Sequence, residues 1–346
     1  MQRQICGAVL AAWLIAGGAA GWARAQEKSA AEQVDVPRLN EAFIRAYNDK
    51  EWAKAIELGE KLQAADPTNE THLYNLACVY ALGGHGDKAV DAFRRAADDG
   101  FPDYELAATD PDLDSIRGKD GYKTGLETIR KNSAKMLESF KEKAAQSEPL
   151  IIVPKGLDAD KPAAAVVALH GFGGSADRFA EAWKAAAEKA GAILILPRAV
   201  LPAGSGYQWG TSDQAAILVN AALEKARSKH TIDAKRVVLT GFSQGGMLSY
   251  TLGLRYADQF AAVIPVCGNY NPLALKDATE NKKRLPRFFI MVGGEDIGLN
   301  ASRQAERELR EAGAKVALEV YEGVGHEFPK NRDDELAKAL KFALGS

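Results

Sequence analysis

The apolar residues of this 346-residue chain change their spacing at Pro149, and this change constrains the fold more than any other feature. Before it, over residues 36–140, apolar residues recur at helical spacing without strand alternation. After it, short β-rich runs alternate with amphipathic helical stretches at 176–190, 213–229, 245–256 and 302–312. Such alternation predicts an α/β fold with a mainly parallel sheet covered by helices on both faces. The strands are expected at 150–153, 164–169, 192–196, 236–240, 261–266, 288–292 and 316–321.

The helical first half contains a repeat. The segment that starts at Trp52 is echoed 34 residues later by the segment that starts at Gly86, and each has a small alanine (Ala55, Ala89) at the matching position. This pattern resembles tetratricopeptide repeats, whose period is 34 residues, although Gly59 stands where a large aromatic residue is usual. The resemblance implies an all-α domain over residues 36–145. Such repeats either present a concave surface to a peptide or protein partner or orient the neighbouring domain, and both possibilities stay open.

The N-terminus is typical of an export signal. Arg3 supplies a positive charge, residues 5–20 form an apolar run without charges, and Ala23 and Ala25 provide small residues before a cleavage point. The sequence therefore predicts a signal peptide over residues 1–25, a linker over 26–35, and a periplasmic or secreted protein with no stable membrane insertion after cleavage. A retained membrane anchor is the alternative.

Charge and cysteine content exclude several classes of function. A formal net charge of −2 offers no basic field to hold nucleic acid. Two of the three cysteines, Cys78 and Cys267, fall in different halves of the chain and are expected to be small buried residues rather than a disulfide framework. The lone histidines of the first half lack metal-ligand spacing, so we expect no metal.

Residues 241–245 (Gly-Phe-Ser-Gln-Gly) follow a predicted strand and precede a predicted helix. They match Gly-x-Ser-x-Gly, a sharp turn that holds a serine hydroxyl out at the sheet edge above a helix N-terminus. The free amides there favour the negative charge of a tetrahedral intermediate. We therefore predict that Ser243 is a nucleophile.

A serine nucleophile needs a base and an acid that orients it. His326 lies in a glycine-rich turn after the last predicted strand, at the same sheet edge, and is the predicted base. Asp296 follows the penultimate strand and is the predicted acid, with the adjacent Glu295 as the competitor. His230 lies between a helix and a strand and is expected to be structural.

Residues 170–174 (His-Gly-Phe-Gly-Gly) form a glycine-rich loop after an early strand. Its backbone, with that of the serine turn, predicts an oxyanion hole made by the N–H groups of Phe172 and Gln244. His170 is expected to be a structural hydrogen-bonding residue. Gly173 and Trp209 are predicted to contact the substrate, although a buried structural role for Trp209 is equally consistent with the pattern. Residues 196–211 and the polar, irregular stretch 269–287 are expected to line the acyl pocket, and neither is long enough for a large helical lid.

The four motifs together resemble the α/β-hydrolase superfamily over residues 146–346. Gly-Phe-Ser-Gln-Gly-Gly at 241–246 is particularly similar to the phospholipase/carboxylesterase group and to secreted polyhydroxybutyrate-depolymerase-like esterases. The resemblance implies a Ser-His-Asp esterase for small to medium acyl substrates, with no metal and no organic cofactor. The residues after the acid, Ile297 onward, depart from the group's usual apolar or proline pattern. A serine peptidase or thioesterase on the same triad, and a repeat-based binding protein with a vestigial hydrolase domain, are the alternatives.

Overall fold

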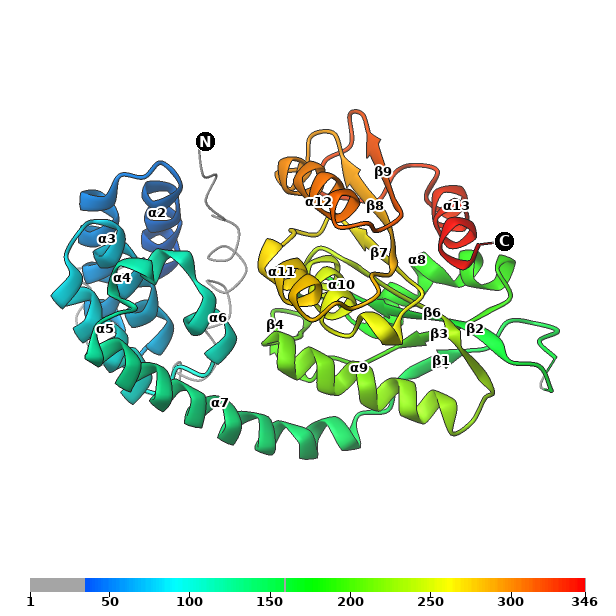
Figure 1. Cartoon of the computed structure of the whole chain (residues 1–346), viewed down its shortest axis with the longest axis horizontal. Coiled ribbons are helices and arrows are strands. Elements are labelled where there is room, and N and C mark those ends of the chain that lie inside the picture. The colour runs from blue at the N-terminus through cyan, green and yellow to red at the C-terminus, as the bar shows by residue number, and fades with distance from the viewer. Residues whose placement is uncertain (1–34, 159, 346) are drawn as a thin grey trace. The chain divides into compact units, whose positions relative to one another are not determined.

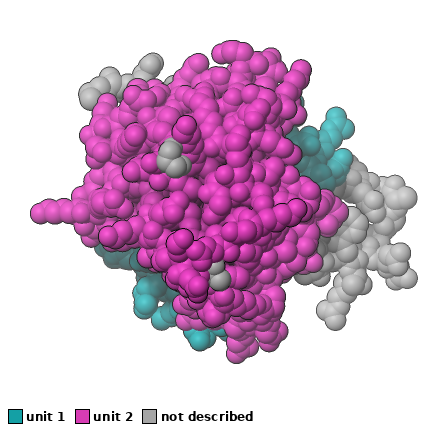
Figure 2. All heavy atoms as spheres, turned by 90° about the vertical axis from the view of Figure 1, so that its right-hand side faces the viewer, with its two compact units in different colours: residues 1–139 teal, residues 140–346 magenta. Residues whose placement is uncertain are grey.

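The computed structural model describes residues 35–158 and 160–345, which form two compact units divided between Ser139 and Phe140. Figure 2 colours the two units separately, and Figure 1 labels their helices and strands. The expected signal peptide and all but the last residue of the expected linker lie outside the described residues. No helix of the described residues is long and apolar enough to cross a bilayer.

In the described residues of unit 1, every regular secondary-structure element is a helix. Helices α2 and α4 begin at residues 36 and 70, and α3 and α5 begin at residues 52 and 86, so both members of a helix pair recur after 34 residues. Asn69 caps α4 by accepting a hydrogen bond from the His72 N–H at 3.0 Å. The helices are α2 (Val36–Asn48), α3 (Trp52–Ala65), α4 (Glu70–Leu82), α5 (Gly86–Asp98), α6 (Tyr104–Thr109), the 3₁₀ helix η1 (Pro111–Ile116) and the first turns of α7 (Asp120–Gln146).

Gly59, the departure from the repeat pattern, is buried between helices. A Cβ atom there would lie 3.1 Å from Leu76 Cδ1 and 3.2 Å from a ring carbon of Phe43. The Phe43 ring, on the preceding helix, therefore occupies the space that an aromatic side chain at position 59 would fill. Both neighbours belong to the single apolar core of unit 1.

Two of the buried carboxylates of the same unit, those of Asp110 and Asp112, accept hydrogen bonds from tyrosines. The Tyr47 hydroxyl donates to Asp112 Oδ2 at 2.6 Å, and the Tyr74 hydroxyl donates to Asp110 Oδ2 at 2.8 Å. Burial raises the pKa of Asp112 to about 7, and the neighbouring Asp110 carboxylate adds to the shift. These bonds tie η1 to α2 and α4.

The boundary between the units falls inside α7, earlier than the break expected at residues 145/146. The helix continues to Gln146, and its last turns carry Phe140 and Ala144, which pack into the core of unit 2. Because these two apolar side chains are buried in its core, the second unit begins at residue 140, within the mostly polar last turns of α7.

Unit 2 is built on a seven-stranded sheet in the order β1-β3-β2-β6-β7-β8-β9 (Figure 1). All neighbouring pairs are parallel except β1 and β3. The strands are β1 (Leu150–Ile152), β2 (Ala163–Leu169), β3 (Ala192–Leu196), β6 (Ile232–Phe242), β7 (Ala262–Val266), β8 (Arg287–Gly293) and β9 (Val316–Tyr321). Their fully apolar central runs are explained by burial on both faces.

Alternate strand residues pack on helices of opposite faces, which confirms the mainly parallel, two-sided sheet. Helices α8 (Ala176–Lys189) and α13 (Arg332–Leu344) cover one face. The other face carries α9 (Ser212–Arg227), α10 (Gln244–Arg255), α11 (Pro272–Glu280) and α12 (Leu299–Glu311), and the short η2 (Ala257–Gln259) follows α10.

The two segments expected to line the acyl pocket contain regular structure, although 269–287 was expected to be irregular. Residues 269–287 contain α11, which Asn271 caps by accepting from the Leu273 N–H and which Pro272 starts. Residues 196–211 contain a two-stranded hairpin, β4 (Leu201–Ala203) and β5 (Gly206–Gln208). The hairpin lies beside the glycine-rich loop 170–174, as described next.

Candidate active site

Ser243 occupies the turn between β6 and α10, with φ 55° and ψ −114°. A non-glycine residue rarely adopts positive φ, so the surrounding contacts must impose it. A Cβ atom at Gly241 would lie 2.2 Å from the Gly245 carbonyl oxygen, and one at Gly245 would lie 2.1 Å from the Leu169 carbonyl oxygen. The two glycines therefore allow the start of α10 to approach the ends of β6 and β2, and the serine is pushed out between them.

Three predicted residues form one chain of hydrogen bonds. His326 Nε2 lies 2.8 Å from Ser243 Oγ, and His326 Nδ1 lies 2.8 Å from Asp296 Oδ2. The Asp296 side chain is 1% exposed, whereas that of His326 is 46% exposed. Because a carboxylate only accepts hydrogen bonds, it holds the proton on Nδ1 and leaves Nε2 free to accept the serine proton.

The competing carboxylate points elsewhere. Glu295 is exposed, and Asp296 is fixed by a second hydrogen bond, from the Gly298 N–H to its Oδ1 at 2.7 Å. A Cβ atom at Gly298 would lie 3.1 Å from Asn269 Oδ1 and 3.2 Å from Asp296 Oδ1, so the glycine leaves room beside the carboxylate. The residue after Asp296, Ile297, is 91% exposed and takes no part in this arrangement.

The glycine-rich loop lies against the serine turn. A Cβ atom at Gly171 would lie 3.3 Å from Ser243 Cβ. The loop is held by backbone bonds to the hairpin: the Gly173 N–H donates to Tyr207 O at 3.0 Å, and the Tyr207 N–H donates to Gly174 O at 2.9 Å. Within the described residues no hydrogen bond uses the Phe172 N–H, and the Gln244 N–H, at the first position of α10, has no acceptor within the helix.

Trp209 packs against His170, the first residue of this loop. Its side chain is fully buried, its Nε1–H donates to His170 O at 2.8 Å, and its ring packs 4.8 Å from the His170 ring. Of the two roles considered for Trp209, burial favours the structural one over substrate contact. His170 is 2% exposed, and burial lowers its pKa, so it is a neutral structural residue. Gly173 contributes backbone at the loop, with φ 70°.

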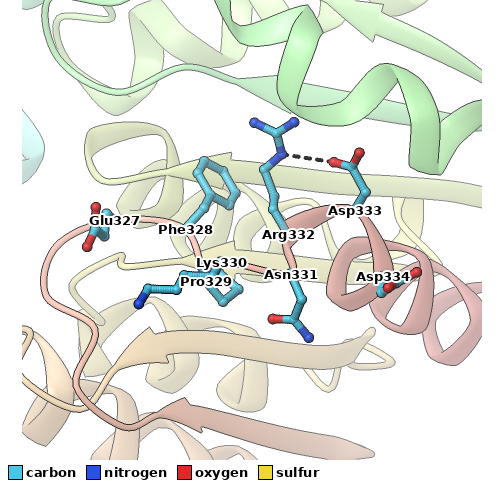
Figure 3. A pocket seen from close by; sticks show the side chains of 8 residues that line it. All are labelled: Glu327, Phe328, Pro329, Lys330, Asn331, Arg332, Asp333 and Asp334. Carbon is cyan, nitrogen blue, oxygen red and sulfur yellow. Dashed lines mark hydrogen bonds and ion pairs between the residues drawn. The ribbon is translucent and has the colours of Figure 1, made fainter.

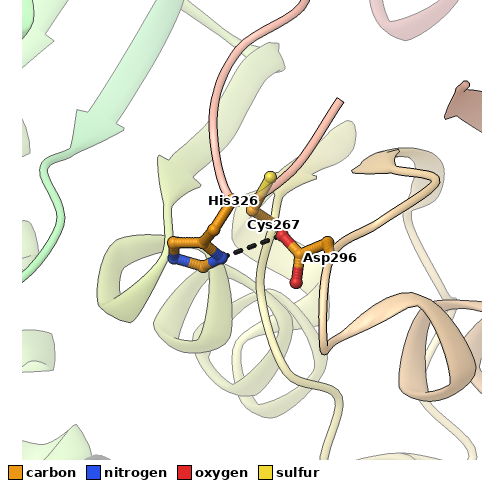
Figure 4. Close-up of side chains that lie close together, drawn as sticks. All are labelled: Cys267, Asp296 and His326. Atoms are coloured by element: carbon orange, nitrogen blue, oxygen red, sulfur yellow. Dashed lines mark hydrogen bonds and ion pairs between the residues drawn. The ribbon is translucent and has the colours of Figure 1, made fainter. Parts of the chain in front are cut away.

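Two features near His326 were not singled out from the sequence. Cys267, in the turn after β7, lies beside Asp296 and His326 (Figure 4), and only the strand order reveals this. Phe242 packs 5.2 Å from the His326 ring and 5.1 Å from the Phe328 ring. Phe328 also lines an open groove of about 520 Å³ formed by residues 327–334 (Figure 3).

Comparisons with known proteins match this second unit. Residues 203–343, which include Ser243, Asp296 and His326, match the model of the dienelactone hydrolase family. In fold, the unit resembles the crystal structure of esterase PE8, with a TM-score of 0.50 over 57% of this chain and 99% of that chain at 20% identity. The second unit has the α/β-hydrolase fold.

Curated relatives match about a third of this chain. The bifunctional acetylxylan esterase/xylanase XynS20E of Neocallimastix patriciarum is 28% identical over 115 residues, which are 33% of this chain and 16% of that protein. A probable feruloyl esterase C of Aspergillus flavus is 30% identical over 127 residues, 35% of this chain and 46% of that protein. Poly(3-hydroxyalkanoate) depolymerase C of Paucimonas lemoignei is 29% identical over 125 residues, 34% of this chain and 30% of that protein. The chain thus spans less than half the length of each of these relatives.

Proposed function

We propose that the chain is a serine esterase that hydrolyses carboxylic esters of small to medium acyl groups through an acyl-enzyme on Ser243. The observation that carries the proposal is the hydrogen-bond chain from Ser243 through His326 to the buried Asp296, with 2.8 Å at each step. A histidine that bridges a serine with positive φ and a buried carboxylate is typical of a catalytic triad and is not expected of an ordinary surface histidine. The match to the dienelactone hydrolase model and the esterase names of the relatives support the same chemistry.

The geometry gives each residue one task. As the Ser243 oxygen attacks the ester carbonyl carbon, its proton passes to His326 Nε2, and Asp296 stabilises the imidazolium that forms. The carbonyl oxygen becomes an oxyanion, which the N–H groups of Phe172 and Gln244 stabilise by about 3 kcal/mol per donor. His326 then returns the proton to the leaving alcohol, whose C–O bond breaks. Water repeats the sequence on the acyl-enzyme and releases the acid.

The surroundings of the site favour small and medium esters. Helix α11 is the one helix within residues 269–287, and at 9 residues it is too short to cover the site as a large lid. Beside the base, Phe242 and Phe328 present partly buried aromatic surface, and the open groove continues from there. The names of the relatives point to acetyl, feruloyl and hydroxyalkanoate esters as the first substrates to test.

We propose two further assignments on the sequence patterns. Residues 1–25 direct export and are removed before Gln26, which places the enzyme in the periplasm or outside the cell. Unit 1 belongs to the tetratricopeptide-like class, supported by the 34-residue recurrence of its helix starts, and binds a peptide or protein partner. N-terminal sequencing of protein recovered from the periplasm of a bacterial host tests the first assignment. A start at Met1 contradicts it.

The esterase proposal is tested with a fluorophosphonate probe and matched serine variants. Ser205, an exposed serine between β4 and β5, provides the control, and we expect both the native protein and Ser205→Ala to be labelled. Ser243→Ala is expected to be unlabelled, and its turnover is expected to be lower on the order of 10⁶-fold. Equal labelling of Ser243→Ala, or no labelling of folded native protein, refutes the proposal. Acyl esters of increasing chain length, acyl thioesters and aminoacyl amides assayed side by side separate an esterase from a thioesterase or a peptidase.

A further inference from the structure

Three potential metal ligands converge at the ends of three neighbouring strands. Cys267 follows β7, Asp296 follows β8 and His326 follows β9, and these strands are adjacent in the sheet. Their ligand atoms (the thiol sulfur, a carboxylate oxygen and an imidazole nitrogen) all lie within 4.8 Å of one another (Figure 4). The esterase mechanism uses the aspartate and the histidine but leaves the thiol without a task.

We propose that Cys267, Asp296 and His326 form a binding site for a thiophilic divalent cation, Zn²⁺ in the first place, and that binding switches the hydrolase off. The second half of this proposal rests on the proposed esterase function, whereas the first half does not. A thiolate, an imidazole and a carboxylate are the ligand types that zinc takes in proteins, and a water molecule completes its tetrahedral shell.

A second cluster in the chain shows why this one is suited to a metal. Cys78, Asp110 and Asp112 are also within 4.8 Å of one another, but all three are buried. Hydrogen bonds do not distinguish the two clusters, because Asp296 also accepts two and the Cys267 thiol donates to Glu327 O at 3.6 Å. The cluster at the active site instead includes an imidazole whose side chain is 46% exposed. A cation can therefore enter there from solvent by way of His326.

The ligand atoms, now within 4.8 Å of one another, must change their spacing to accept the ion. Ligand atoms around a tetrahedral zinc lie about 3.3–3.6 Å apart, as follows from bond lengths of about 2.0–2.3 Å. His326 Nδ1 and Asp296 Oδ2, now 2.8 Å apart, must separate by about half an ångström. The adjustment falls on the His326 side chain, because the backbone before it is closely packed: a Cβ atom at Gly293 would lie 2.2 Å from both Val324 O and Gly325 O.

Binding would disable the base by a defined proton shift. Because zinc binds the thiolate, the Cys267 thiol proton must pass to solvent as the sulfur binds the metal. When Nδ1 of His326 becomes a ligand, its proton moves to Nε2, which then no longer accepts the proton of Ser243. The ion with its two charges is neutralised by one thiolate and one carboxylate, so the buried site carries no net charge.

The experiment measures inhibition and binding separately. Esterase activity is measured against Zn²⁺ concentration, with and without EDTA, in the native protein, Cys267→Ser and the matched control Cys78→Ser. Binding is followed without substrate by the ultraviolet thiolate-to-metal absorption of Cd²⁺ in a Cys6→Ser/Cys78→Ser background, in which Cys267 is the only cysteine. Circular dichroism checks that each variant is folded, and His326→Ala, at an exposed position, removes a ligand without touching the core.

We expect zinc to inhibit the native protein and Cys78→Ser reversibly. Inhibition of Cys267→Ser is expected to need at least about tenfold more zinc, because loss of even a residue that hydrogen-bonds to a metal ligand lowers metal affinity about 10- to 100-fold. The Cd²⁺ band is expected in the single-cysteine background and is lost or weakened by Cys267→Ser and by His326→Ala. Equal zinc sensitivity of Cys267→Ser, or a Cys6→Ser/Cys78→Ser protein without the band, overturns the proposal. A band at Cys267 in a protein without esterase activity supports the site and refutes the proposed function.

Discussion

Replacing Asp296 by asparagine tests the proposed triad most sharply, because the local hydrogen bonds dictate how the new amide must lie. Asp296 Oδ1 accepts the Gly298 N–H at 2.7 Å, and Oδ2 accepts from His326 Nδ1 at 2.8 Å. In Asp296→Asn the amide oxygen must face Gly298, since an NH₂ group there would oppose another donor. The NH₂ group therefore faces His326 Nδ1 and donates to it.

This orientation reverses the histidine tautomer. The proton moves to Nε2, which then has no lone pair for the Ser243 proton, although the fold and the oxyanion donors are unchanged. We expect kcat to fall about 10⁴-fold, equivalent to about 5.5 kcal/mol of transition-state stabilisation, with a small change in KM. The exposed Glu295→Gln is the matched control and is expected to change kcat less than about twofold.

The assay is steady-state hydrolysis of p-nitrophenyl acetate by the native protein and both variants, with circular dichroism to establish that each is folded. The reasoning is refuted if Asp296→Asn retains most of its activity, or if Glu295→Gln loses as much as Asp296→Asn. The second outcome would transfer the role of the acid to Glu295.

Three other predictions follow from the packing. Gly245→Ala should give little folded protein, because its Cβ atom would lie 2.1 Å from Leu169 O; normal yield and melting temperature would contradict the close approach. Trp209→Phe removes the hydrogen bond to His170 O, and leaving this buried acceptor unpaired costs about 1–3 kcal/mol. We expect a lower melting temperature and a lower kcat. An unchanged melting temperature and kcat would show that the loop does not need this hydrogen bond. Burial raises the pKa of Asp112 to about 7, so between about pH 4 and pH 7 the folded state binds more protons than the unfolded state. The free energy of unfolding therefore falls as pH rises through this range, by at most about 1.4 kcal/mol per pH unit. Thermal unfolding from pH 4 to 7.5 should show Asp112→Asn increasingly more stable than the native protein as pH rises, and parallel curves would contradict this.

The sequence was most informative where local sterics decide the structure. The Gly-x-Ser-x-Gly spacing around Ser243 reflects contacts within a few residues, and the positions of Asp296 and His326 after strands place them at one sheet edge once a parallel sheet is inferred. The sheet itself could be predicted because its strands are short, apolar and separated by amphipathic helices.

Features that depend on distant segments escaped prediction. The proximity of Cys267 to the acid requires the strand order β7-β8-β9, which no local pattern encodes. For Trp209 the sequence left a buried structural role and a substrate contact open, because the choice depends on a hairpin whose strands have only three residues each. Residues 110–112 (Asp-Pro-Asp) are typical of an exposed turn, yet tyrosines from two other helices bury both carboxylates.

The way the loop 170–174 is held has a consequence for how such an enzyme changes over evolutionary time. Main-chain bonds alone connect Gly173 and Gly174 to Tyr207 of the hairpin, and the Tyr207 side chain itself is 44% exposed. Side chains at positions 172 and 207 are thus free to be exchanged without moving the amide groups of the loop. Selection, or a designer working with a library at these two positions, can vary substrate preference while the chemistry of bond cleavage is inherited intact.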